Sequence, residues 1–443
     1  MDLIELVAEI VAQCKAKGAD ECDCLIEAGR ELEIKVRKGE IESIEQSRFS
    51  GVGIRFFAKS CLGFSFTTDF SRDAIANAIE QARAFALNGS PDPATGIETY
   101  DTFEPLEIFD PKIDETSLSA KIEMALSCEQ AAYDFDPRIK NTYGASYSDQ
   151  KTRIILANSR SDPIEYEGTR FELACIPVAE QNGEKRMGMW LSTERFLDEL
   201  EPPTVIGTTA AQRAIQMIGA RKVPTQKASV VFDPRTGAEV VENIFESVDG
   251  ERVLKGMSFL KDRLGEKVGS SLATFVDDGR LPHRVGSRPF DAEGISTRRT
   301  VCIDKGTVRN FLYDVRSARK AGTKPTGNAR RGFTSVPSVG ANNFYLIPGN
   351  IPRDQIIESL QNGVLIMNLL GFGVNVTTGD FSRGAEGLWI KNGRITHPVD
   401  GITIAGNLLQ MLADLKSVGS DLRFFGRIGS PTFVIGEMTI AGD

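Results

Sequence analysis

Two glutamates in the segment GAEVVENIFESVDG, residues 237–250, have the spacing of an acid–base pair. Glu242 and Glu246 are four positions apart, so a helix would present both carboxylates on one face. Such a pair can transfer protons when its surroundings push the two pKa values apart. Most pairs of this kind belong to a solvated helix face. Because Glu239 and Asp249 add two more acids nearby, we interpret this face as exposed to solvent.

The same segment has the outline of a zinc-hydrolase helix that lacks its imidazoles. Such a helix carries two histidines on one face and, beside the first, a glutamate that takes a proton from the metal-bound water. Here Val241 precedes Glu242, and Glu246 occupies the second ligand position. The two histidines of the chain, His283 and His397, are distant in sequence. We therefore expect no histidine-ligated metal in this chain.

Nucleophilic catalysis has no readable signature in the sequence. Neither His283 nor His397 has a serine, cysteine or acid at a spacing typical of a triad, so both are expected to be surface or structural residues. Seven scattered cysteines are typical of reduced thiols. We interpret Cys22 and Cys24 as small buried residues rather than a metal or redox pair, and we expect Cys302 to be buried in a strand.

Two further stretches resemble ligand-binding loops only superficially. The glycine-rich stretches at 371–375 and 379–387 contain neither GxGxxG nor GxxxxGK[ST], so they predict turns and β-bulges. The segment KPTGNARR, residues 324–331, has basic side chains suited to a carboxylate or phosphate. We interpret it as a solvated loop.

Length, charge and hydropathy bound the class of protein. A chain of 443 residues with 41% hydrophobic residues has enough material for two or three packed domains. A net charge of -9 argues against direct nucleic-acid binding, which needs a basic surface. Apolar runs are too short for a membrane helix, and the first residues carry acids where a signal peptide carries bases. These features favour a cytoplasmic protein with no membrane role.

Hydrophobic periodicity predicts an α+β fold. Apolar residues at helical spacing predict a helix from Leu3 to Gly18 capped by Asp2, and a second capped by Ser71. Alternation around residues 32–45 predicts antiparallel hairpins. Helices set among strands, without a regular β-α-β rhythm, favour α+β over a doubly wound class. Further helices are predicted at 116–134, 209–219, 237–249, 353–362 and 406–417, within an N-terminal α+β domain (1–222) and a mainly β domain with a few helices (223–443).

Ordered blocks along nearly the whole chain resemble the TldD/PmbA family, labelled "modulator of DNA gyrase", and within it the PmbA (TldE) branch. The blocks include GEIESIEQSRFSGVGIRFF, RPFDAEGISTRRTVCIDKGTVRNFLYD, TGNARR, VNVTTGDFSRGAEGLWIKNGRITHPVDGITIAGNLLQML and GSPTFVIGEMTIAGD. The resemblance implies an N-terminal α+β domain, a mainly β C-terminal domain, and two chains that pair around a cavity.

The resemblance also implies how the chemistry is divided between the branches. In the TldD branch a helix bearing HExxxH and a later cysteine bind zinc, and the protein hydrolyses unfolded peptides. Laid on that pattern, Val241 and Glu246 replace the histidines, Glu242 keeps the glutamate position, and no cysteine follows Cys302. This loss is typical of the PmbA branch. It implies a subunit that is inactive alone and binds no cofactor itself, with zinc expected in a TldD-like partner.

Several functions remain open at this stage. The resemblance suggests peptide maturation and antitoxin degradation, with this chain in a heterodimer with a TldD-like subunit or in a homodimer. A second function is a non-proteolytic, protein-binding modulator of DNA gyrase or its inhibitors. A third is an independent hydrolase that uses Glu242 and Glu246, with a metal held by carboxylates.

Overall fold

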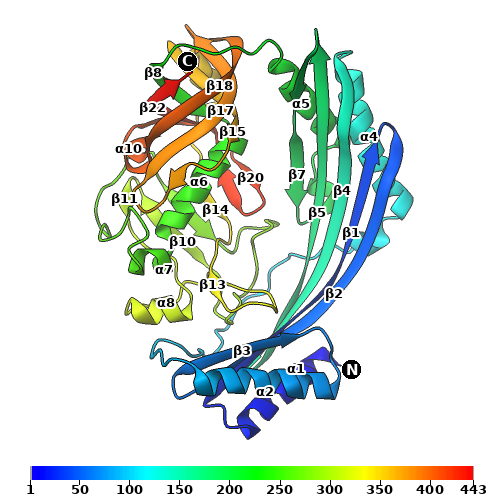
Figure 1. Ribbon diagram of the computed structural model, residues 1–443, viewed down its shortest axis with the longest axis vertical. Coiled ribbons are helices and arrows are strands. Elements are labelled where there is room, and N and C mark those ends of the chain that lie inside the picture. The colour runs from blue at the N-terminus through cyan, green and yellow to red at the C-terminus, as the bar shows by residue number, and fades with distance from the viewer. Residues whose placement is uncertain (1, 443) are drawn as a thin grey trace.

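A long, curved antiparallel sheet forms one side of the molecule in the computed structural model, which describes residues 2–442. The C-terminal half of the chain lies against the concave side of this sheet (Figure 1). Its strands are β1 (Glu21–Arg37), β2 (Glu40–Ala58), β3 (Cys61–Thr67), β4 (Ile139–Asn158), β5 (Ser161–Gln181), β6 (Glu184–Met187) and β7 (Trp190–Glu194). They pair in the order β3-β2-β1-β4-β5-β6, with β7 also beside β5.

Helices cover the two ends of this sheet. They are α1 (Leu3–Ala16), α2 (Arg72–Asn88), α3 (Lys112–Glu115), α4 (Leu118–Phe135), the 3-10 helix η1 (Leu197–Glu199) and α5 (Pro203–Gln216). Helices α1 and α2 pack at one end, and α4 and α5 at the other (Figure 1). The predicted caps are confirmed, because the side chains of Asp2 and Ser71 accept hydrogen bonds from the N–H groups of Ile4 and Ala74.

Strand β1 is buried on both faces along residues 22–26. Cys22, Cys24 and Ile26 pack into the core beneath α1 and α2, whereas Leu25 faces Phe290 of the C-terminal half. All seven cysteines are free and buried. The prediction of small buried residues at Cys22 and Cys24 is therefore confirmed, as is the burial of Cys302 in its strand.

The C-terminal half contains two larger sheets. Its strands are β8 (Gln226–Phe232), β9 (Phe275–Asp278), β10 (Arg299–Asp304), β11 (Thr307–Val308), β12 (Ala329–Arg330), β13 (Ser338–Val339), β14 (Phe344–Leu346), β15 (Asn362–Leu370), β16 (Val374–Asn375), β17 (Asp380–Lys391), β18 (Arg394–Asn407), β19 (Leu415–Val418), β20 (Arg423–Phe425), β21 (Ile428–Ser430) and β22 (Phe433–Ala441). One sheet runs β15-β8-β22-β18-β17-β16 with β19 beside β22; the other runs β11-β10-β9-β14-β21-β20. The short pair β12-β13 stands apart.

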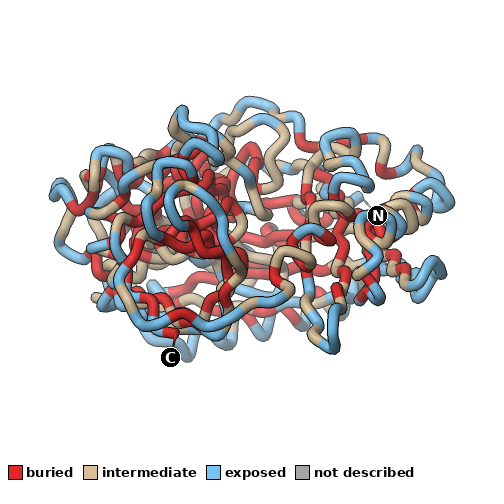
Figure 2. Tube along the Cα trace, turned by 90° about the horizontal axis from the view of Figure 1, so that it is seen from above, coloured by how far each residue is buried: buried red, intermediate tan, exposed pale blue. Residues whose placement is uncertain are grey.

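Five helices accompany these sheets: α6 (Pro234–Val248), α7 (Gly250–Leu254), α8 (Val315–Lys320), α9 (Arg353–Glu358) and α10 (Leu408–Ala413). Helix α6 contacts strands of both sheets, and its apolar side chains join their common core. Buried residues concentrate inside the C-terminal half and along the long sheet (Figure 2). The predicted α+β class is confirmed.

Several predicted boundaries differ from the structure. Helices α9 and α10 are shorter than the predicted 353–362 and 406–417, because strands β15 and β19 begin at Asn362 and Leu415. Gly371 and Gly379 adopt positive φ angles of 68° and 82°, as turn glycines do. In residues 2–442 no helix is both long and apolar enough to cross a membrane. The division into domains at 222 and 223 stays a prediction.

Candidate functional site

Helix α6 is fixed at both of its ends. The Asp233 side chain accepts a hydrogen bond from the Thr236 N–H at 2.8 Å and forms an ion pair with Arg213 at 2.6 Å. At the other end, the Asp249 carboxylate caps α7 by accepting from the N–H of Glu251 at 2.8 Å. The side chains of α6 are therefore held in a fixed register against the two sheets.

Val241 faces the apolar core. Val241 is 1% exposed. Its side chain packs around a cavity of about 20 Å³ that is also lined by Val240, Ile244, Phe275 and Leu346. The other lining residues of this cavity are also apolar. A valine at this position supplies no ligand atom, and its surroundings supply no polar group to orient one.

The two glutamates lie on the outer side of the helix. Glu242 is exposed and makes no hydrogen bond or ion pair within residues 2–442. Partial desolvation, and then the negative charges of Glu246 and Glu239, raise its pKa. The Glu246 carboxylate lies 3.3 Å from the guanidinium of Arg252. The pair thus shares one face, as predicted, but one member is already neutralised by an arginine.

Asp249 does not belong to a solvated face, so that expectation is wrong. Its side chain is 14% exposed, and burial raises its pKa to about 6 although the N–H groups of Glu251 and Arg252 oppose the shift. The reason is its position between α6 and α7, where it caps the second helix. It has a structural role in the helix pair.

A zinc ion does not fit the residues of this site. Within residues 2–442 no group of three or more histidine, cysteine, aspartate or glutamate side chains is placed to hold a metal ion. His283 contacts Glu199 through Nδ1, and the His397 Nδ1 lies 3.0 Å from the Thr396 hydroxyl. The structure does not bring either histidine to α6.

The interpretation of residues 324–331 as a solvated loop is wrong for their second part. Residues 326–329 are buried, and the Arg331 side chain is only 1% exposed. Arg331 Nη1 donates to Asp23 Oδ1 at 3.1 Å, and its Nη2 lies 3.0 Å from Asp23 Oδ2. The Arg331 guanidinium of this segment is therefore held in an ion pair with strand β1.

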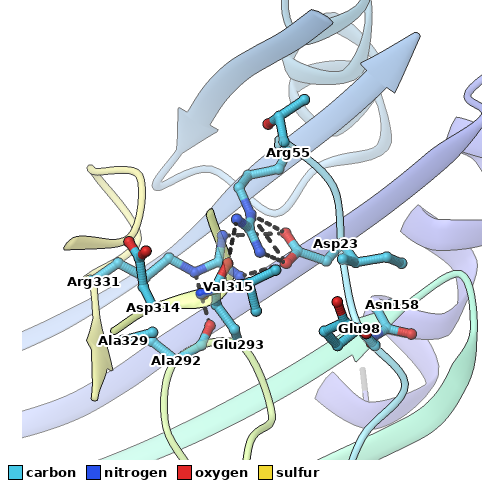
Figure 3. Close-up of polar contacts among 12 residues, drawn as sticks. Asp23, Arg55, Glu98, Asn158, Ala292, Glu293, Asp314, Val315, Ala329 and Arg331 are labelled. Carbon is cyan, nitrogen blue, oxygen red and sulfur yellow. Dashed lines mark hydrogen bonds and ion pairs between the residues drawn. The ribbon is translucent and has the colours of Figure 1, made fainter. Parts of the chain in front are cut away.

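This ion pair belongs to a buried network between the long sheet and the C-terminal half (Figure 3). Arg55 Nε donates to Asp23 at 3.0 Å, and Arg55 Nη1 donates to Glu293 at 2.9 Å. Burial alone would raise the pKa of Asp23, but Arg331 and Arg55 hold it below its ordinary value. Burial raises the pKa of Glu293 to about 7 despite Arg55. The network aligns the two halves around a cavity.

A cavity of about 600 Å³ lies between strands β4 and β5 and the loops of the C-terminal half. Six arginines line it, and we call it the arginine cavity: Arg170, Arg195, Arg288, Arg330, Arg331 and Arg427. A second cavity, of about 460 Å³, lies between β7 and β20. Two arginines of the arginine cavity, Arg330 and Arg331, lie in the basic segment 324–331 noted in the sequence. The other four have no local signal, because they are scattered over more than half of the chain.

Three family models match the chain in succession. They are the PmbA/TldA metallopeptidase domain 1 at residues 22–86, the central domain at 111–218 and the C-terminal domain at 225–442. The chain belongs to the PmbA/TldD metallopeptidase family. It is 30% identical to the Metalloprotease PmbA of Escherichia coli O157:H7, over 99% of this chain and 96% of that protein.

Solved members of the PmbA/TldD family share the fold over the full length. A Thermotoga maritima protein named a candidate modulator of DNA gyrase is 25% identical, with a TM-score of 0.91 over 99% of this chain and 100% of that one. TldE from Thermococcus kodakarensis has the same TM-score and coverage at 22% identity, which shows the shared fold. The resemblance to the PmbA/TldE branch is thus confirmed.

Proposed function

We propose that this chain is a non-catalytic subunit of a cytoplasmic TldD/TldE-type zinc metallopeptidase that acts on unfolded peptides. In this proposal a TldD-like partner holds the zinc and performs hydrolysis. The observation that carries the proposal is the burial of Val241 in the apolar core at the first ligand position of the family helix. A water-activating metal needs ligand atoms there.

The other motif positions support the same proposal. Glu246, at the second ligand position, is paired with Arg252 at 3.3 Å. Glu242 keeps the carboxylate of a general base, but no described ligand set would place a metal-bound water beside it. A base without an activated water contributes little to peptide hydrolysis.

The proposed work of the subunit is to complete a chamber and hold an extended peptide. An extended peptide can add to an exposed sheet edge through main-chain hydrogen bonds. The cavities between the long sheet and the C-terminal half offer space for such a segment. The family resemblance suggests two classes of substrate, namely ribosomally made peptides that are matured and an antitoxin that is degraded.

Peptide hydrolysis by separated and mixed chains tests the proposal. A TldD-like relative with an intact HExxxH motif, encoded in the same genome, is purified and loaded with zinc. An unfolded peptide is then incubated with this chain, with the relative, and with the mixture. We expect this chain alone to be inactive and the mixture to exceed the relative alone, with all activity lost on chelation. Zinc-dependent turnover by this chain alone would refute the proposal.

A gyrase-directed function predicts a different pattern. Two solved neighbours are named as candidate modulators of DNA gyrase. The net charge of -9 disfavours direct DNA contact but not contact with a protein. This alternative predicts that the chain binds gyrase or a gyrase inhibitor and leaves the hydrolysis rate of the relative unchanged.

A further inference from the structure

Several arginines of the arginine cavity have no carboxylate in direct contact. No carboxylate lies within 4.0 Å of the guanidinium nitrogens of four of its arginines in residues 2–442. These four are Arg195, Arg288, Arg330 and Arg427. Of the residues that line the cavity, Glu27 is the single carboxylate. Burial raises the pKa of Glu27, although a hydrogen bond from the Phe333 backbone opposes the shift.

Neutral acceptors satisfy three of these arginines. Arg330 Nε donates to the Ala341 carbonyl oxygen at 2.7 Å. Arg195 donates to the carbonyl oxygens of Thr169 at 2.8 Å and Val285 at 2.7 Å. Arg288 donates to the side-chain oxygen of Asn342 at 3.1 Å. Such bonds fix the position of a guanidinium without pairing its charge with a carboxylate. The buried Asp291 and Asp277 act on Arg288 and Arg330 only from beyond ion-pair distance. The cavity therefore has a rigid, positively charged wall.

The Arg427 side chain has no protein partner within the described chain, although its backbone carbonyl oxygen accepts from the Phe344 N–H at 2.9 Å. Arg427 lies in the turn between β20 and β21, after Gly426 with its φ of 63°. Its side chain makes no hydrogen bond or ion pair in residues 2–442, although it lines the cavity. Arg427 is exposed to solvent; desolvation by its neighbours, and then the charge of Arg288, lower its pKa to about 10, so it is still a cation at neutral pH. Its five N–H donors remain available for a ligand.

The cavity, with a volume of about 600 Å³, is larger than a single small anion needs. Its floor is the sheet face where Thr152 lies opposite Gly168 and Ile154 opposite Tyr166. This floor offers hydroxyl groups and apolar surface together. Consecutive residues line the arginine cavity and the second cavity at 194–195, 284–285 and 425–426, so the two spaces adjoin. An extended ligand can occupy both.

We propose that the arginine cavity binds the carboxylates of an acidic peptide segment, so that this subunit selects acidic regions of unfolded peptides. This inference rests on the proposed function, because it names a substrate class for the same peptide-holding role. Guanidinium groups bind carboxylates through paired, charge-assisted hydrogen bonds. Four arginines without a directly paired carboxylate can bind several negative charges. Aspartate and glutamate side chains along one peptide segment supply such charges.

Fluorescence anisotropy with a matched pair of labelled peptides tests this inference. One unfolded peptide is rich in aspartate and glutamate, and the other has the corresponding amides. Binding is measured with this chain alone and with its mixture with a TldD-like subunit. We expect the acidic peptide to bind at least about tenfold more tightly than the amide peptide at low salt, and the difference to shrink as salt is added.

Variants assign the effect to the cavity. Arg427→Gln removes a side chain without internal partners, so the fold is expected to survive. Affinity for the acidic peptide should fall about tenfold, as for the loss of one charge-assisted hydrogen bond, whereas affinity for the amide peptide should not change. Arg263→Gln is the matched control, because Arg263 pairs with Glu266 outside the cavity. Arg330→Gln provides a second test inside the cavity.

Three results would overturn the inference. They are equal affinity for the two peptides, an unchanged affinity in both cavity variants, and displacement of the acidic peptide by inorganic phosphate at concentrations far below the dissociation constant of the peptide. The last result would reassign the cavity to a phosphate ligand. Binding is measured without hydrolysis, so a failure here is distinct from a failure of the subunit to stimulate a peptidase.

Discussion

Arg55 and Glu293 are separated by 238 residues and meet in a buried ion pair at 2.9 Å. Their side chains are 5% and 3% exposed, and Arg55 also contacts Asp23 of strand β1. The pair therefore joins the long sheet to the C-terminal half. Arg331 contacts the same aspartate and lines the arginine cavity. The alignment of that cavity thus depends on a charge network that is largely hidden from solvent.

Removal of Arg55 is predicted to be costly. Arg55→Met leaves Glu293 without its arginine and Asp23 with only Arg331, and an uncompensated buried charge typically costs about 3–5 kcal/mol. The free energy of unfolding in urea measures the loss. Arg83→Met is the control, because Arg83 and Glu80 form an exposed pair whose loss should cost less than about 1 kcal/mol. Similar, small losses in both variants would contradict the structural role of the network.

Glu242 is predicted to be dispensable for hydrolysis. If zinc is held only by the partner, as proposed, the Glu242 carboxylate has no metal-bound water to activate, and Glu242→Gln in this chain should leave the peptidase rate of the mixed subunits unchanged within about twofold. The corresponding glutamate-to-glutamine change in the HExxxH motif of the partner should abolish activity. Initial rates on an unfolded peptide give both results. Loss of activity from Glu242→Gln alone would favour an independent hydrolytic site in this chain.

Restoration of the two histidines is predicted not to create a zinc enzyme. The double variant Val241→His, Glu246→His places an imidazole in the apolar core and leaves the site without the later cysteine. We expect a loss of stability of about 1–3 kcal/mol and no stoichiometric zinc after dialysis. Elemental analysis and thermal unfolding measure both. Bound zinc together with chelator-sensitive turnover would contradict the description of this helix.

Asp249 is predicted to make stability depend on pH. Burial raises its pKa from 3.8 to about 6 in the folded chain, so its contribution is present below pH 3.8 and is lost as the pH rises through about 6. Asp249→Asn keeps a capping side chain and cannot ionise. Relative to the natural chain, the variant should gain about 2 kcal/mol in the free energy of unfolding between about pH 4 and about pH 7. If the difference in the free energy of unfolding between the variant and the natural chain does not change with pH over this range, the pKa of Asp249 is not raised in the folded chain.

Local patterns predicted the helices best. The starts of α1 and α2 follow from apolar periodicity and from the capping side chains of Asp2 and Ser71, which are signals within a few residues. The apolar pattern predicts a helix at 209–219, but α5 begins at Pro203. Proline is common in the first turn of a helix, whereas a sequence pattern treats it as a residue that ends helices. The lengths of β4 and β5 are set by pairing across the sheet, which local patterns do not report.

The same contrast between local patterns and long-range contacts applies to the residues of the candidate site. The chemistry of Val241, Glu242 and Glu246 was readable because all three lie on one helix. The buried ion pair between Arg331 and Asp23, which are 308 residues apart, cannot be predicted from local patterns. Only the tertiary fold brings the two residues together. Of the arginines that line the arginine cavity, local patterns indicate only Arg330 and Arg331, in the basic segment 324–331. The charge of the cavity becomes visible only when strands β4 and β5 and the C-terminal loops are placed face to face.

The most direct test of the subunit proposal is a titration of this chain into a fixed amount of a zinc-loaded, TldD-like relative, with unfolded-peptide hydrolysis as the readout. We expect no hydrolysis by this chain alone. In the mixture, we expect the rate of peptide hydrolysis to rise with added chain and to level off near equal amounts of the two subunits. A rate that stays at the value of the relative alone would contradict the account.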